Sequence, residues 1–260
     1  VSVDFDWVPG SEQSVEQLFN MFQRYELRPT LFFTGGFAAA NPGIVLQAKA
    51  LGYEIGTHGL HHGLDPRENF GAGTSYDTQK ELITRSTEII TSITGQAPKL
   101  FRAPMLKISD VTFEILCDLG YEVDSSVPAG RFDFGMGSVC KLDNINKSCK
   151  AYHIEKKTGS LMEIPPSAFI LPLNMRLLRL FPQTFVRYCT IIMRKVCSPL
   201  VFYMHPAEFV SVKDLTLPRE YAKGFYRDCG PHHLAVLERF FEFILTQGFR
   251  SEYMLDRSPV

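Results

Sequence analysis

Apolar runs rich in β-branched and aromatic residues alternate with helical patterns along the first half of the chain, and this alternation restricts the fold more than any other feature. Strands are expected at residues 1–6, 29–34, 53–57, 100–101 and 121–124. The stretches between them predict helices at residues 14–25, 41–52, 76–94 and 109–119. Such alternation is typical of βα units that build a parallel sheet, and repeated units that close on themselves form a barrel.

The second half interrupts this pattern. Residues 128–198 contain a loop-like stretch and then an apolar segment with basic residues, which indicates an insertion. The pattern returns with an apolar strand at residues 200–205 and a last helix at residues 232–246. No linker divides the chain, so we expect a single domain over residues 1–260 with an insertion at about residues 128–198.

Charge and composition exclude several classes of protein. The 260 residues include 27 Lys and Arg against 28 Asp and Glu, so the net charge is −1 and no basic stripe indicates binding to nucleic acid. No apolar stretch is long enough to span a bilayer. The six cysteines form no Cys-x-x-Cys pair, so we expect free thiols rather than a zinc ribbon. The chain opens on Val1 inside a predicted strand; we expect a segment to precede it, and a cytoplasmic or membrane-associated location.

Two aspartates stand at the end of the first strand, and parallel sheets place functional residues at the carboxyl ends of strands. Asp4 and Asp6 are two residues apart and therefore point to the same face. Two carboxylates on one face repel each other unless a cation, a proton or an arginine lies between them. The alternative is the end of a surface strand, or an N-cap for the next segment.

Two histidines follow the third strand. His58 and His62 form His-x-x-x-His, and on one helical turn residues four apart face the same way, which suits two imidazoles on one metal ion. His61 lies between them and is expected at the rim or behind the ligands. Two histidines and one carboxylate from the Asp-x-Asp pair would leave a coordination position open, as catalytic metal sites do. By itself, His-x-x-x-His is more often structural.

Three more polar residues stand at strand ends. Arg102 can hold a carboxylate in bidentate geometry, or it can form a salt bridge across the mouth of the barrel. Asp124 ends the strand at residues 121–124. His205 ends the strand at residues 200–205, where it is either a structural histidine or a general acid.

Four motifs in this order resemble those of the NodB-homology polysaccharide deacetylases, carbohydrate esterase family four. They are Ser2-Val-Asp-Phe-Asp-Trp7, His58-Gly-Leu-His-His62, Arg102-Ala-Pro104 and Met204-His205. The resemblance covers about residues 1–249. It implies a distorted (β/α) barrel and a metal-dependent hydrolase that removes an N-acyl group, usually N-acetyl, from an amino sugar in a polysaccharide or glycolipid.

The chain departs from the family pattern in three places. Asp-x-Asp replaces the adjacent aspartates of the first motif, and Gly59 stands where the family has Ser or Thr. The fourth motif, Asp-x-x-Asp-Trp, has no clear copy. Asp124 and Asp133 are the candidates for its aspartate, the residue that would tune His205.

The resemblance implies a metal site and a base. Asp6, His58 and His62 would bind a divalent metal, which in this family points to zinc. Asp4 would be the general base, oriented by Arg102.

The resemblance also implies the groups that handle the substrate. The backbone N–H near Met105 would stabilise the oxyanion, and His205 would protonate the leaving amine. Met105, Asp124 and Trp7 are the expected substrate contacts.

Two other functions stay open. A hydrolase of the same fold can act on a cyclic ureide or imide or on an N-formyl sugar, and a carbohydrate-binding relative can have lost its chemistry. The five candidate catalytic positions all carry competent side chains, which favours an enzyme. An N-acylated carbohydrate is the expected partner, and the oligomeric state is not predicted.

Residues 173–196 combine apolar side chains with five basic residues and contain no acidic residue. Pro182 is expected to divide the segment into two short helices. Either their apolar side is core and their arginines are solvated, or they form an amphipathic surface for a membrane or for the tail of a lipid-linked sugar. The two alternatives differ in the exposure of Leu177, Leu178, Phe185, Ile191 and Ile192.

Overall fold

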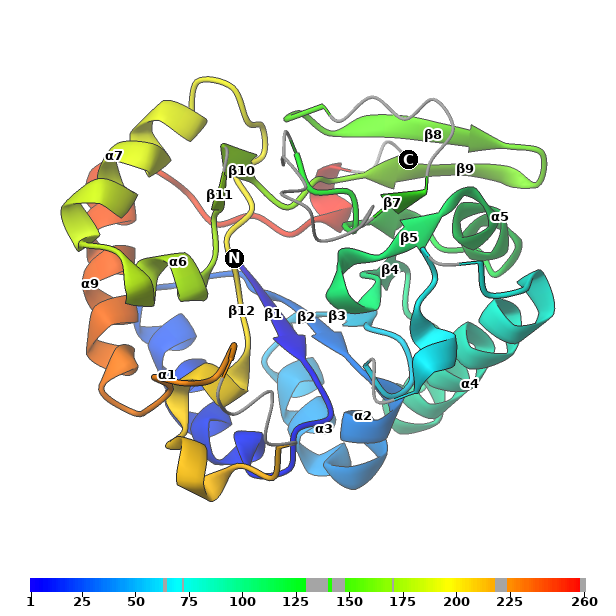
Figure 1. Cartoon of the computed structure of the whole chain (residues 1–260), viewed down its shortest axis with the longest axis horizontal. Helices are drawn as coiled ribbons and strands as arrows, with labels where there is room; N and C mark the ends of the chain where they lie inside the picture. Colours follow the sequence, from blue (N-terminus) through cyan, green and yellow to red (C-terminus); the bar gives the residue numbers. More distant parts are fainter. Residues whose placement is uncertain are drawn as a thin grey trace.

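A curled sheet of eight strands forms the centre of the molecule, in the order β12-β1-β2-β3-β4-β6-β9-β8 (Figure 1). The computed structural model describes residues 1–62, 65–71, 73–129, 140–141, 148–169, 171–217 and 224–257. The strands of the sheet are β1 (Ser2–Phe5), β2 (Thr30–Phe33), β3 (Glu54–Thr57), β4 (Leu100–Phe101), β6 (Val123–Asp124), β8 (Tyr152–Lys156), β9 (Gly159–Glu163) and β12 (Tyr203–Met204).

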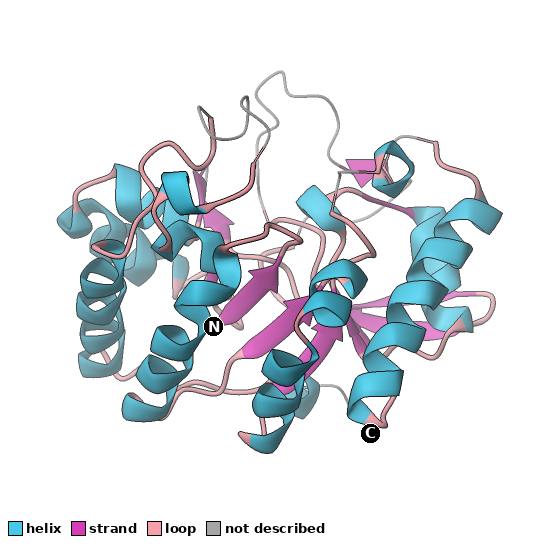
Figure 2. Cartoon of the chain, turned by 90° about the horizontal axis from the view of Figure 1, so that it is seen from below, coloured by secondary structure: helices cyan, strands magenta, loops and turns pink. Residues whose placement is uncertain are grey.

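Helices flank the sheet, and Figure 2 shows them packed around the strands. The α-helices are α1 (Val15–Arg24), α2 (Gly35–Ala40), α3 (Pro42–Ala50), α4 (Tyr76–Thr94), α5 (Asp110–Asp118), α6 (Met175–Leu180), α7 (Gln183–Met193) and α9 (His233–Thr246). Short 3-10 helices are η1 (Ser11–Ser14), η2 (Pro66–Glu68), η3 (Pro104–Leu106), η4 (Pro206–Phe209), η5 (Val212–Asp214) and η6 (Leu255–Arg257). Two small sheets pair β5 (Ile108–Ser109) with β7 (Cys140–Lys141) and β10 (Ala168–Phe169) with β11 (Leu171–Pro172).

The sheet is a barrel that stays open. From β12 to β9 every neighbouring pair of strands is parallel, while β8 joins β9 as an antiparallel hairpin. In the described part of the chain β12 and β8 are the two edges of the sheet. The predicted α/β fold, a distorted (β/α) barrel in one domain, is therefore confirmed. Its parallel strands bring their carboxyl ends to the same rim.

The local signals of the sequence explain most of the elements. Ser75 caps the start of helix α4, because its hydroxyl accepts a hydrogen bond from the Thr78 N–H, and Gly95 caps the end with a left-handed φ of 74°. Pro182 separates α6 from α7, as predicted. The strand predicted at residues 200–205 shrinks to two paired residues.

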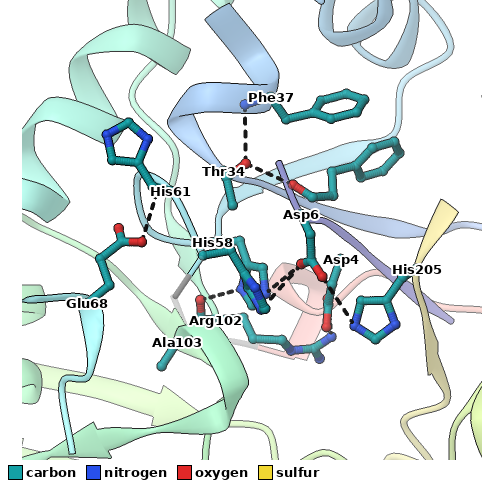
Figure 3. A network of polar contacts seen from close by, with 12 residues as sticks. Asp4, Asp6, Thr34, Phe37, His58, His61, Glu68, Arg102, Ala103 and His205 are labelled. Carbon is teal, nitrogen blue, oxygen red and sulfur yellow. Dashed lines mark hydrogen bonds and ion pairs between the residues drawn. The ribbon is translucent and has the colours of Figure 1, made fainter. Parts of the chain in front are cut away.

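Helix α2 was not predicted, because its first two residues are glycines, which disfavour a helix. Thr34 caps it by accepting a hydrogen bond from the Phe37 N–H at 3.2 Å. The same hydroxyl donates to the Phe5 carbonyl at 3.0 Å. Thr34 thus joins the start of α2 to the end of β1, directly before Asp6 (Figure 3).

The core fixes where the strands of the rim end. All four residues of β1 and all four of β2 are buried, and the rings of Phe5 and Phe33 stack with centroids 4.2 Å apart. Apolar side chains of α1 and α9, among them Phe22 and Phe241, belong to the same cluster. Burial of this extent makes the position of the β1 carboxyl end hard to shift.

The segment predicted as an insertion is partly a wall of the barrel. Strand β9 pairs in parallel with β6, so residues 159–163 continue the main sheet rather than leave it. The five cysteines whose side chains the structure describes are free thiols, as expected. No helix in the described ranges has the length and apolar character needed to cross a membrane.

Candidate active site

A cavity of about 660 Å³ opens at the rim formed by the carboxyl ends of β1, β3 and β12. Its polar end contains five of the residues selected from the sequence: Asp4, Asp6, His58, His62 and His205. Met105 of η3 and apolar residues of α6 form other parts of the wall. The strand ends therefore bring together side chains up to 201 positions apart in the sequence, from Asp4 to His205.

Asp6, His58 and His62 form one cluster of ligand atoms. Asp6 Oδ1 lies 3.5 Å from His58 Nε2 and 3.4 Å from His62 Nε2, and the three ligand atoms all lie within 4.8 Å of one another. Around a tetrahedral ion with ligand distances of about 2.0–2.2 Å, neighbouring ligand atoms are about 3.3–3.6 Å apart. Asp6 Oδ1 is buried and has no hydrogen-bond partner among the residues that the structure describes. An oxygen and two imidazole nitrogens in this arrangement fit a divalent metal ion.

His58 has a fixed ring orientation. Its backbone N–H donates to the Phe33 carbonyl at 2.8 Å, which holds the residue at the end of β3. Its Nδ1 lies 2.8 Å from the Arg102 carbonyl, so the ring presents Nε2 to Asp6 (Figure 3). A second partner of this kind is what orients metal-binding histidines.

His62 reaches the cluster through a turn and not through a helix, so the predicted helical geometry is wrong. Gly59 and His62 both have left-handed φ angles, of 72° and 49°. A Cβ atom on Gly59 would lie 2.7 Å from Pro104 Cγ, which explains glycine where the family has Ser or Thr. The buried carboxylate of Glu68 accepts hydrogen bonds from the backbone N–H groups of Leu60 and His61 and holds the turn.

His61 lies on the other side of this turn and points away from Asp6, as expected (Figure 3). Its ring packs beside Trp7, with centroids 5.2 Å apart. Trp7 is 36% exposed and is not among the residues that line the cavity, so its expected contact with substrate finds no support in the structure.

Asp4 is held by Arg102. The Arg102 Nη1 donates to Asp4 Oδ1 at 2.7 Å, and the side chains are 0% and 3% exposed, respectively. Arg102 also donates to Ser2 Oγ at 2.7 Å and to the carbonyl and hydroxyl of Ser125 at 2.9 and 2.8 Å. Its guanidinium lies 4.4 Å from the centre of the Phe32 ring. Arg102 pairs with a carboxylate as predicted, but through one contact, Nη1 to Oδ1, and not in the predicted bidentate geometry. This contact fixes the orientation of Asp4.

Asp124 lies behind this pair and not in the cavity. It is fully buried and accepts hydrogen bonds from the N–H and hydroxyl of Ser126 at 3.0 and 2.7 Å. Burial raises the pKa of Asp124. The prediction that Asp124 contacts substrate is wrong, because β6 turns its side chain into the protein. The two serines that follow it support Arg102 and Ala103 instead.

Glu208, which the sequence analysis missed, is the partner of His205. The Glu208 Oε2 lies 3.2 Å from His205 Nδ1 and accepts the His205 backbone N–H at 2.9 Å. Glu208 is buried, and its Oε1 lies 3.2 Å from Arg179 Nε. Asp124, one of the two candidates from the sequence, does not take this role, because its carboxylate accepts hydrogen bonds from Ser126 instead. The other candidate, Asp133, lies outside the described residues. The spacing of three in His205-Pro-Ala-Glu208, a capping box of η4, was the available signal.

Burial and neighbouring charges shift the pKa values of Asp6, His62 and His205. Burial would lower the pKa of His205, but Asp6 and Glu208 outweigh it and raise that pKa to about 9. Burial is the main cause that lowers the pKa of His62 to about 4, which keeps this imidazole neutral. Burial opposes ionisation of Asp6, yet the charges of His62 and His205 hold the pKa of Asp6 well below its usual range. At neutral pH Asp6 is thus a carboxylate and His62 a neutral imidazole, the forms of these two side chains that bind metal.

Met105 lines the cavity in an unusual backbone conformation. Met105 and Leu106 have successive φ angles of 57° and 56°, in the left-handed region. Residues held in this region cost free energy and persist where the surrounding structure fixes them. The side chain of Met105 is 38% exposed, at the wall of the cavity.

Comparison with known proteins identifies a family model and several proteins that are similar to this chain. The family model described as Polysaccharide deacetylase matches residues 1–123. A peptidoglycan deacetylase of Helicobacter pylori is 29% identical over 123 residues, which are 47% of this chain and 40% of that protein. The match thus spans less than half the length of this curated relative.

Solved structures share the fold over nearly the whole chain. A family 4 carbohydrate esterase from Streptomyces lividans has a TM-score of 0.56 at 16% identity, and the match covers 98% of this chain and 92% of that chain. A Puue allantoinase has a TM-score of 0.62 at 16% identity, and the match covers 95% and 71% of the two chains. The structural similarity continues past residue 123, the position at which the match to the family model ends.

Proposed function

We propose that the chain is a member of the polysaccharide deacetylase family and that its cavity is the active site of a metal-dependent hydrolase, which removes N-acetyl groups from amino sugars in a polysaccharide or glycolipid. The convergence of Asp6, His58 and His62 beside the buried Asp4–Arg102 pair supports this proposal most directly. The match to a peptidoglycan deacetylase supports an N-acetylated carbohydrate as the substrate.

Zinc is the proposed metal, held by Asp6, His58 and His62. Their mixed oxygen and nitrogen donors, three in number, are those of catalytic zinc sites that keep one position open. When bound, the ion would lower the pKa of a water molecule and polarise the acyl carbonyl. Tyr226 donates to the second oxygen of Asp6 at 3.3 Å and so fixes which oxygen faces the histidines.

Asp4 is the proposed general base. It lines the cavity, and the ion pair with Arg102 keeps the carboxylate in one orientation. A base held in place can accept the proton of an attacking water without reorienting during the reaction. Arg102 is buried and does not line the cavity, so it acts by positioning Asp4.

His205 is the proposed general acid. Glu208 contacts its Nδ1, and its Nε2 lies 4.0 Å from Asp6 Oδ2, on the cavity side. The contact of Glu208 with Nδ1 favours the protonated ring, which could then donate a proton to the leaving amine. The cavity thus holds a base and an acid on different elements, β1 and the end of β12.

A panel of substrates tests the proposal. Protein loaded with zinc is incubated with N-acetylglucosamine oligomers, peptidoglycan fragments, an N-formyl amino sugar and allantoin, and released acetate, formate or ureide product is quantified. We expect acetate from at least one N-acetylated sugar, and loss of that activity after chelation.

Two variants make the result specific. Asp4→Asn should keep its zinc and lose about 10²–10⁴-fold in turnover. Asp77→Asn is the matched control, because Asp77 is exposed in the first turn of α4, far from the cavity lining. Hydrolysis of allantoin without any release of acetate would assign the chain to the alternative, a cyclic ureide hydrolase.

A further inference from the structure

We propose that the outer face of α6 and α7 docks on an anionic lipid bilayer next to the mouth of the cavity. This α6–α7 face consists of Leu180, Phe181, Phe185, Tyr188, Ile191 and Lys195. Figure 1 shows both helices at one side of the molecule, packed on α9.

The apolar side chains of this face are exposed to an unusual degree. Leu180 is 53% exposed, Tyr188 is 63% exposed, and Phe181, Phe185 and Ile191 are 40–41% exposed. They are among the most exposed large apolar residues of the described chain. A contiguous group of this kind marks an interaction site rather than scattered surface residues.

The same helices have a separate side that belongs to the core. Leu177, Leu178 and Val186 are buried, so α6 and α7 are already anchored without the exposed residues. On α7 the positions 185, 188 and 191 fall on one side of a 3.6-residue helix, and Lys195 lies in the turn that follows the helix. Neither alternative of the sequence analysis holds for the whole segment: its inner side is core, and its outer side is an apolar surface.

Charge indicates which surface this face meets. No Asp or Glu occurs from Ile164 to Ala207. Four cations on or beside the face are Arg176, Arg187, Arg194 and Lys195, and none of them has an ion pair among the described residues. Arg179 is the exception in this segment, because it is buried against Glu208.

The carboxylates of the neighbouring helix α9 do not neutralise these cations. Glu238 accepts hydrogen bonds from Arg24 and Tyr25, and Glu242 accepts one from Tyr25, on the side of α1. Aromatic and aliphatic side chains beside cations that form no ion pair with a described residue match the headgroup region of an anionic bilayer.

The face and the cavity are continuous. Leu180 and Phe181 are part of the exposed face and also line the cavity, and Arg176 stands at the same wall. The rings of Phe181 and Phe185 connect the two regions, with centroids 5.4 Å apart. If the proposed function holds, a lipid-linked amino sugar could enter the cavity directly from the membrane.

Vesicle flotation tests the docking. Zinc-loaded protein is mixed with vesicles of phosphatidylcholine alone or with 30% phosphatidylglycerol at about 0.1 M salt, and the bound fraction is measured. We expect binding to the anionic vesicles that weakens as salt increases. Each cation near a membrane surface contributes about fivefold to binding, so Arg194→Glu with Lys195→Glu should lower the partition coefficient about 30-fold or more.

Further variants separate the apolar and electrostatic parts. Phe185→Ser with Tyr188→Ser should also release the protein from anionic vesicles. Arg85→Glu with Lys99→Glu makes the same change in net charge on another surface, and Leu46→Ser removes an exposed leucine of α3. Both controls should retain most of the binding.

Three results would overturn the proposal: no binding to anionic vesicles, equal binding to neutral vesicles, or equal loss in the control variants. Self-association that disappears in Phe185→Ser with Tyr188→Ser, without vesicle binding, would make a second copy the occupant and would also overturn it. The four substituted positions, Phe185, Tyr188, Arg194 and Lys195, lie outside the cavity lining, so zinc content and turnover of a soluble sugar should not change. Failure of docking is therefore distinguishable from failure of the proposed function.

Discussion

Replacing Arg102 with methionine removes the cation that pairs with Asp4 in the interior. Arg102 is 0% exposed, and four hydrogen bonds join it to Asp4, Ser2 and Ser125. Methionine has a similar length but no donors. The substitution therefore leaves a buried carboxylate without its counter-ion while changing the packing little.

The expected loss of stability is large. Breaking a buried ion pair by removing one partner costs about 3–5 kcal/mol, a substantial part of the roughly 5–15 kcal/mol that stabilises a typical protein. At about 2–4 °C per kcal/mol for a chain of this size, a loss of about 4 kcal/mol lowers the melting temperature by about 8–16 °C.

Urea unfolding of the variants in a double-mutant cycle measures this loss of unfolding free energy. Arg102→Met, Asp4→Asn and the pair are compared with the wild type, and Arg85→Met serves as an exposed control with an expected change within about 0.5 kcal/mol. The double variant should be more stable than the sum of the single changes predicts, by about 1–3 kcal/mol. A loss below about 1 kcal/mol for Arg102→Met, or strict additivity, would refute the assignment of Arg102 as the buried partner of Asp4.

Three further predictions follow from the site. Gly59→Ser introduces the residue type found in the polysaccharide deacetylases that the chain resembles, and it should lower both the melting temperature and the zinc affinity. The reason is that the added Cβ would lie 2.7 Å from Pro104 Cγ on a residue with a left-handed φ. An unchanged melting temperature and zinc affinity would contradict the geometry of the turn. Glu208→Gln should move the alkaline limb of the pH–rate profile to lower pH, because Glu208 helps to raise the pKa of His205. Turnover should fall while the zinc content is preserved. A profile that does not move would show that Glu208 does not raise the pKa of His205. In chelator-treated protein, the stabilisation from protonated His205 is fully present below its unfolded pKa of about 6.5 and is lost as pH rises through its folded pKa of about 9. The difference in unfolding free energy between wild type and His205→Ala should therefore shrink from pH 6.5 to pH 9, and a constant difference would disprove the shift.

The elements that carry strong local signals could be predicted from the sequence. Strands β1 and β2 are continuous apolar runs, and α4 has both a serine cap and a glycine end, so their positions follow from residues close in the chain. Asp4, Asp6, His58 and His205 could be placed together because parallel strands share a rim. Helix α2 could not be predicted, because it begins with two glycines and because the bond from Thr34 to the Phe5 carbonyl of β1 is a tertiary contact.

Side-chain partners were harder to predict than positions. Asp124 and Glu208 are both acidic residues near predicted strand ends, and only the direction of the chain after β6 and β12 decides which one reaches His205. The turn that carries His62 depends on hydrogen bonds to Glu68. This residue comes six positions after His62 and belongs to a separate 3-10 helix, η2. Contacts of this kind follow from tertiary structure and leave no periodic pattern in the sequence.

The central claim is that Asp6, His58 and His62 hold one divalent metal ion, and zinc binding measures it without knowledge of the substrate. Chelator-treated wild type, Asp6→Asn, His58→Ala and the control Asp77→Asn are titrated with zinc by calorimetry. The account predicts one tight site per chain in the wild type and the control, and loss of that site in the two ligand variants. Equal zinc binding by Asp6→Asn, or no tight binding by the wild type, would contradict it.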